Sequence, residues 1–133
     1  MDTHVTAAPG SDIWPVTWAA DDNLYLGWGD GGGFGGTNSD GRVSIGVARI
    51  EGGPEAFVGV NVNGGRNPVH LASIERGKPS AIISVDGILY VWLNTQNDTP
   101  PDFRLAWSDD LGETWQLSDW AFPGSGDFSQ ASF

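Results

Sequence analysis

Short apolar runs alternate with clusters of turn-forming residues along most of the chain. The runs are rich in β-branched and aromatic residues, and they are too short for the long periodic pattern of a helix. Gly, Pro, Asn and Asp bound them, as is typical of strands in antiparallel sheets. The pattern therefore predicts an all-β protein with eight strands, at 14–19, 24–28, 42–49, 56–62, 80–85, 88–94, 103–108 and 115–120.

The second half of the chain repeats the first. The segment TWAADDNLYLGW, which contains Leu24 and Tyr25, aligns with IISVDGILYVW, which contains Leu89 and Tyr90, at an offset of 65 positions (89 − 24) apart from a one-residue slip at the last Trp. Further along, ARIEGGPEAF at 48–57 aligns with AWSDDLGETW at 106–115 at an offset of 58 (106 − 48). Such a repeat indicates two units that are built alike.

Each repeat holds four predicted strands, and the inner strands are apolar almost throughout. This is typical of a propeller blade, because neighbouring blades cover both of its faces. We therefore predict a partial β-propeller of two four-stranded antiparallel blades over 12–122, with blade one at 12–62 and blade two at 79–122, a flexible N-terminus at 1–11 and a tail at 123–133. The alternative is an eight-stranded β-sandwich, which has the right strand count but does not require the two halves to be similar.

A turn motif, SDDLGETW, lies between the third and fourth strands of the second repeat. It fits the pattern SxDxGxTW at each fixed position, which here are Ser108, Asp110, Gly112, Thr114 and Trp115. Ser and Asp hydroxyl and carboxylate groups bond turn amides, Gly tolerates positive φ, and a Trp packs beneath such a turn. The motif is therefore predicted to be structural.

The motif resembles the Asp box, or BNR repeat, of sialidase-like propellers. More broadly, IWPVTWAADDNLYLGWGDGGGFGGTNSDGRVSIGVARIEG and GKPSAIISVDGILYVW resemble the N-terminal blades of an uncharacterised bacterial propeller family that is distantly similar to arabinan-cleaving glycosidases. The resemblance covers most of 12–122 and implies a carbohydrate ligand. It also implies a parent fold of five or more blades, so that two blades alone expose apolar faces. A homo-oligomer that completes a propeller is therefore expected.

In such propellers, ligands bind on the side that carries the loop between strands two and three and the connection between blades. Here that loop is GDGGGFGGTNSDG at 29–41, with seven glycines in thirteen residues. Asp30 is the first catalytic candidate because it follows an aromatic residue at a strand end, and Asp12 and Asp40 are the others. The expected ligand-binding residues on this side are Trp14, Trp28, Asn38, Arg66, Asn67 and His70.

Three functions follow from these candidates. The favoured one is a carbohydrate-directed propeller protein that binds a glycan or another small polar ligand, with enzymatic activity left open. A glycoside hydrolase, or its inactive relative, is the second, and would need two carboxylates about 5 to 9.5 Å apart. A structural fragment whose property is self-assembly is the third. No cofactor is expected, with calcium at Asp30, Asn38 and Asp40 as the alternative.

The amino-acid composition limits the classes of partner that the chain is expected to bind. With 17 acidic and 6 basic residues the formal charge is −11, which disfavours nucleic acid because that binding depends on Lys and Arg. No run approaches the ~18 apolar residues of a membrane span, and the N-terminus lacks the basic and apolar regions of a signal peptide. We therefore expect a soluble chain with no membrane partner. A secreted or periplasmic parent fits equally well, so the compartment is left open.

Overall fold

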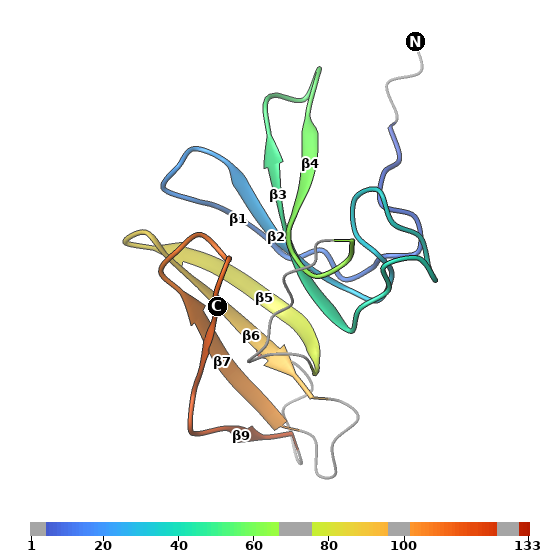
Figure 1. The fold of residues 1–133 in the computed structure, drawn as a ribbon. Coiled ribbons are helices and arrows are strands. Elements are labelled where there is room, and N and C mark those ends of the chain that lie inside the picture. The colour runs from blue at the N-terminus through green and yellow to red at the C-terminus, as the bar shows by residue number, and fades with distance from the viewer. Residues whose placement is uncertain (1–4, 67–75, 96–101, 125–130) are drawn as a thin grey trace.

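The computed structural model describes residues 5–66, 76–95, 102–124 and 131–133. Within these ranges the chain forms two antiparallel β-sheets and no helix (Figure 1). The prediction of an all-β protein is confirmed.

Each repeat forms its own sheet, with the strands in chain order. The first sheet has the order β1-β2-β3-β4, made of Val16–Trp18, Leu24–Gly29, Ile45–Glu51 and Val58–Asn63. The second sheet has the order β5-β6-β7-β8, with β9 also paired to β7, and is made of Lys78–Val85, Ile88–Asn94, Asp102–Ser108, Gln116–Leu117 and Phe122–Pro123. This arrangement is compatible with two propeller-type blades and with a small sandwich.

The strand register supports the internal repeat. Leu26 pairs with Ala48 in the first sheet, and Val91 pairs with Ala106 in the second. Val91 lies 65 positions after Leu26, and Ala106 lies 58 positions after Ala48, so the two offsets seen in the sequence relate one hydrogen-bonded pair to the other. The two repeats therefore correspond in three dimensions at these strands.

Seven of the eight predicted strands differ from the observed ones by one to three residues at an end, and β9 was not predicted. β1 covers only 16–18 of the predicted 14–19. β3 begins at Ile45 rather than at position 42, although the Val43 amide donates to the Gly31 carbonyl (3.1 Å) and so continues the β2–β3 register by one hydrogen bond. β8 is limited to Gln116–Leu117. At the next position the Ser118 amide still donates to the Leu105 carbonyl (2.9 Å) in register, but the Leu105 amide donates to the hydroxyl oxygen of Ser118 (3.3 Å).

The main core lies between the two sheets. Because side chains alternate along a strand, one face of each sheet points toward the other sheet. Tyr25 and Val47 from the first sheet and Leu89 and Val91 from the second are all fully buried in this core. The opposite face of the first sheet carries a second cluster, in which Leu26, Trp28 and Ala48 are buried and Trp14 and Phe34 pack against them.

We expect the contact between Trp28 and Gly46 to be sensitive to a single methyl group. The two residues are paired across β2 and β3, and a Cβ at position 46 would lie 2.1 Å from the Trp28 ring. Gly46→Ala should therefore lower the free energy of unfolding by about 1–3 kcal/mol through overpacking. Urea denaturation followed by tryptophan fluorescence measures this.

Gly53→Ala is the matched control, because a Cβ there meets no atom within 4 Å. Gly53→Ala should change the free energy of unfolding by no more than about 0.5 kcal/mol. Equal losses in the two variants would contradict the packing described for Trp28.

Candidate functional site

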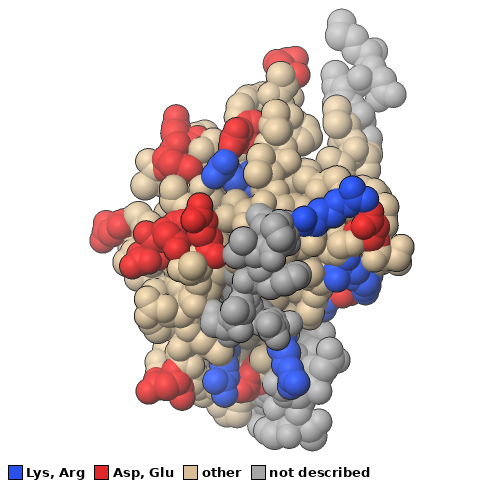
Figure 2. Space-filling model, in the orientation of Figure 1, with Lys and Arg blue, Asp and Glu red and all other residues tan. Residues whose placement is uncertain are grey.

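The catalytic and ligand-binding candidates that the structure describes lie at one end of the first sheet, where β2 gives way to its long loop and β5 begins. The chain entering β1 joins them, because Asp12 and Gly29 exchange backbone hydrogen bonds of 2.9 and 2.8 Å. On the surface, Asp and Glu side chains gather mostly on the left of Figure 2, the side on which the β1–β2 and β5–β6 turns lie in Figure 1. We call the end with the β2–β3 loop the loop end.

The glycine-rich β2–β3 loop is fastened to the first sheet. Asn61 of β4 accepts a hydrogen bond from the Phe34 amide (2.9 Å) and donates to the carbonyls of Gly32 (3.1 Å) and Phe34 (3.0 Å). Ser11 accepts from the Gly33 amide at 3.0 Å. Gly33 has a φ of 67°, and a Cβ there would lie 2.5 Å from Asn61 and 2.7 Å from Trp28. Glycine is therefore needed for the loop to lie this close to the sheet.

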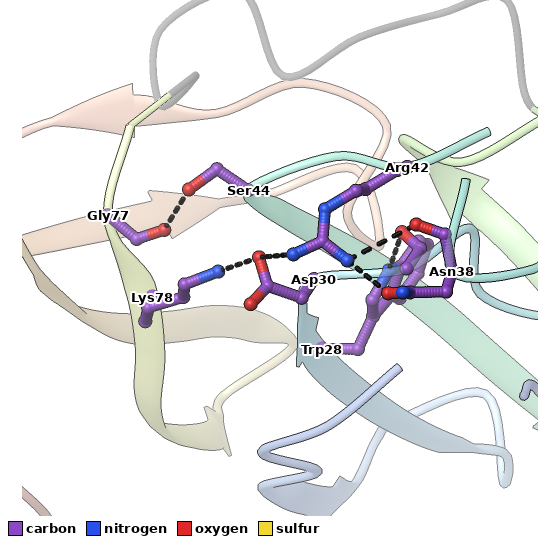
Figure 3. Close-up of polar contacts among 8 residues, drawn as sticks. Trp28, Asp30, Asn38, Arg42, Ser44, Gly77 and Lys78 are labelled. Atoms are coloured by element: carbon purple, nitrogen blue, oxygen red, sulfur yellow. Dashed lines mark hydrogen bonds and ion pairs between the residues drawn. The ribbon is translucent and has the colours of Figure 1, made fainter. Parts of the chain in front are cut away.

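Asp30 lies at the centre of the loop end, between two cations (Figure 3). Its Oδ1 accepts a hydrogen bond from Lys78 Nζ and lies 3.0 Å from Nη2 of Arg42. Arg42 also donates to the backbone carbonyl of Asn38 at 3.2 Å and to the side-chain oxygen of that residue. Ser44 donates to the Gly77 carbonyl at 2.9 Å and so ties the loop to the start of β5.

This pairing sets the charge of Asp30. The hydrogen bond from Lys78 lowers the pKa of the Asp30 carboxyl; partial burial opposes this, and the charges of Lys78 and Arg42 lower it further. The net shift is downward, so the group is ionised at neutral pH. The carboxylate stays within reach of solvent, because 34% of its side chain is exposed, against 17% for Lys78.

The other two acidic candidates lie near the same loop. A Cβ at Gly29 would lie 3.2 Å from Oδ1 of Asp12 and 2.9 Å from Cδ of Lys78, so these two side chains flank that glycine. Asp40 forms an ion pair with Arg66, and both side chains are exposed. The structure therefore brings Asp12 and Asp30 toward Lys78, and places Asp40 with Arg66.

The two tryptophans differ in accessibility. Trp28 is fully buried and its Nε1 donates to the Gly31 carbonyl at 3.3 Å, so its ring supports the loop from beneath and exposes no face to a ligand. Trp14 is half-buried, with its ring centroid 6.0 Å from that of Trp28 and 5.8 Å from that of Phe34. The two remaining candidates, Asn67 and His70, lie outside the described residues.

Three polar residues of the site did not follow from the sequence: Arg42, Lys78 and Asn61. Arg42 and Asn61 fall within the predicted strands 42–49 and 56–62, and Lys78 lies just before the predicted strand 80–85, so no motif marked them. The only local signal was that Lys78 lies two positions before the predicted first strand of the second repeat; in the structure it is the first residue of β5. Among the described residues, no three His, Asp or Glu side chains are grouped to hold a metal ion, and Asp30 and Asp40 have cationic partners instead.

The SDDLGETW turn has the hydrogen bonds that its sequence predicts. Ser108 accepts from the Gly112 amide at 2.8 Å, and Asp110 accepts from the Thr114 amide at 2.9 Å and from the Thr114 hydroxyl at 2.5 Å. Trp115 donates from Nε1 to the Gly112 carbonyl at 2.9 Å, and Gly112 has a φ of 91°. These bonds close the turn between β7 and β8 and are structural.

Comparison with protein-family models found no match for this chain, and comparison with curated proteins found none either. The part of the chain that the structure describes contains no helix long and apolar enough to cross a membrane. The loop end therefore has to be interpreted from its own geometry.

We expect Asp110→Ala to destabilise the β7–β8 turn. The change removes both hydrogen bonds from Thr114 and should lower the free energy of unfolding by about 1–3 kcal/mol. The exposed neighbour Asp109 provides the control, since Asp109→Ala should change it by no more than about 0.5 kcal/mol. Chemical denaturation of the two variants checks this, and similar losses would refute the specific role of Asp110.

The ion pairs of Asp30 predict a pH dependence. A carboxyl with a lowered pKa stabilises the fold above its unfolded pKa of about 4, and this contribution is lost as the pH falls through the folded pKa. Asp30→Asn should therefore be less stable than wild type at pH 7, with the difference shrinking as the pH falls below about 4. Unfolding curves across this range test the prediction, with Asp119→Asn as the exposed control. A difference that does not change with pH would contradict it.

Proposed function

We propose that this protein is a carbohydrate-directed protein of propeller type, which binds a glycan at the loop end without hydrolysing it. The observation that carries the proposal is the Asp30 carboxylate held between Arg42 and Lys78 on a fastened loop. Sugar hydroxyls both donate and accept hydrogen bonds, so they suit a site in which charged donors and acceptors stand side by side.

The fixed position of the loop favours binding. A site that is already ordered loses less conformational entropy when a ligand arrives. The bonds from Asn61 and Ser11 hold the loop backbone, and those from Arg42 and Lys78 hold the Asp30 side chain. Trp14, at the edge of the same loop, supplies a partly exposed aromatic surface of the kind on which sugar rings stack.

The charge state of Asp30 suits hydrogen bonding to a ligand and argues against a general-acid role for this residue. A glycosidase needs one carboxyl group with a raised pKa, which donates a proton to the leaving oxygen. The pKa of Asp30 is shifted downward by its cationic partners. Such a carboxylate accepts hydrogen bonds from hydroxyl groups, whereas it is poorly suited to act as a general acid.

The first experiment is a screen of the purified chain against plant, bacterial and host glycans, followed by calorimetry on the best ligand. Asp30→Asn and Arg42→Gln should each weaken binding by about tenfold or more, which is about 1.4 kcal/mol. Asp86→Asn, in the β5–β6 turn, should bind like wild type. Binding to no glycan, or equal affinity in all variants, would overturn the proposal.

Incubating the protein with the same glycan and measuring the release of reducing sugar distinguishes binding from hydrolysis. Release of reducing sugar by wild type, lost in Asp30→Asn while affinity is kept, would establish hydrolysis instead. We expect the glycan to be recovered unchanged.

A further inference from the structure

The outer face of the second sheet, which points away from the first sheet, is strongly aromatic. The register places Tyr90 opposite Trp107 and Trp92 opposite Leu105 on this face, and all four side chains are half-buried. A satellite cluster extends it, because the rings of Trp120, Phe122 and Phe133 each lie within 6.0 Å of Trp92.

Much of this aromatic surface faces solvent. The exposed fractions are 47% for Trp120 and 54% for both Phe122 and Phe133. Scattered exposed apolar residues are ordinary, but a contiguous patch of large aromatic side chains marks an interaction surface.

The first sheet has a matching outer face. The β2–β3 loop covers the β3–β4 side of this face, where Phe34 lies over Gly59, in the row of Ile50 and Leu24. The β1 side remains open, with Val16 55% exposed and Trp18 64% exposed beside the half-buried Leu24.

The internal repeat indicates what would cover these faces. Tyr90 corresponds to Tyr25 at the offset of 65, and Leu105 corresponds to Val47 at the offset of 58. Tyr25 and Val47 are fully buried because the second sheet packs on them, whereas their counterparts lie on the outer face of the second sheet. That outer face is therefore equivalent to a surface that another sheet covers inside the chain.

The surface of the second sheet that covers the first sheet also has an equivalent in the other repeat. Leu89 and Val91 bury the first sheet's inner face from the other side, and they correspond to Leu24 and Leu26 on the first sheet's outer face. The two outer faces of one chain are thus equivalent to the two halves of its internal interface.

We propose that copies of this chain associate head to tail, with the outer face of the second sheet of one copy on the outer face of the first sheet of the next. The contact continues the stacking of sheets that the chain already makes internally. A heterologous contact of this kind closes into a ring or propagates as a filament. The proposal does not depend on glycan binding, so a negative glycan screen would leave it untouched.

Light scattering coupled to size exclusion tests the assembly. The wild-type chain should have a mass that is a multiple of the single-chain mass, and Trp18→Asp and Phe122→Asp should each give monomers. Val58→Asp is the matched control and should assemble like wild type, since Val58 is 57% exposed but shares a side of the first sheet with Glu51, opposite to Trp18. A monomeric wild type would overturn the proposal.

Mixing the two blocked variants tests the head-to-tail geometry. Trp18→Asp keeps an intact second-sheet face and Phe122→Asp keeps an intact first-sheet face, so the mixture should form a one-to-one dimer. A Trp18→Asp variant that dimerises alone would show a symmetric contact and overturn the geometry. Near-ultraviolet circular dichroism checks folding, and Val16→Asp or Trp120→Asp replaces a variant that fails to fold.

Discussion

The buried ring of Trp28 holds the loop that carries the candidate site against the first sheet. Its ring fills the space above Gly46, and its Nε1 holds the carbonyl of Gly31 in the loop that follows. Trp14 and Phe34 then pack over this ring, so the loop lies against the sheet instead of extending into solvent. Because Asp30 is two residues from Trp28, the same packing fixes where its carboxylate stands.

The electrostatics of the loop end follow from this packing. Asp30 has a φ of 55°, a left-handed conformation that Asp tolerates better than most residues. In this conformation its side chain meets Arg42 from its own loop and Lys78 from the start of β5. The ion pairs thus connect the first sheet to the second, and they also leave an ionised acceptor beside two donors for a polar ligand.

The internal repeat leaves each of the two sheets with an outer face that no other sheet of the chain covers. In a stack of similar units, the terminal units carry faces that no neighbour covers, and such faces are usually modified. Here the first sheet's outer face is partly covered by its own glycine-rich loop, and the second sheet's outer face by residues of the C-terminal segment, with Ser80 donating to the Ala131 carbonyl at 2.8 Å. The coverage is incomplete, and the exposed Trp18 and Phe122 mark where a second copy would contribute.

The sequence by itself determined the local features of this protein. The all-β class, the approximate strands, the two repeat offsets and the turn around Asp110 depend on contacts between residues close in the chain, or on comparing one half with the other. The fourth strand of the second repeat was predicted too long because its pattern did not indicate that the Leu105 amide would bond the hydroxyl oxygen of Ser118.

Only the tertiary structure decided the site. Both faces of β2 are apolar, so alternation alone did not show that Trp28 is buried under its own loop while Trp14 stays partly exposed. The partner of Asp30 is Lys78, 48 positions away, and the loop is held by Asn61, 27 positions beyond Phe34. Such pairs form because two sheets and a loop pack together, and a pattern read along one strand contains no information about that packing.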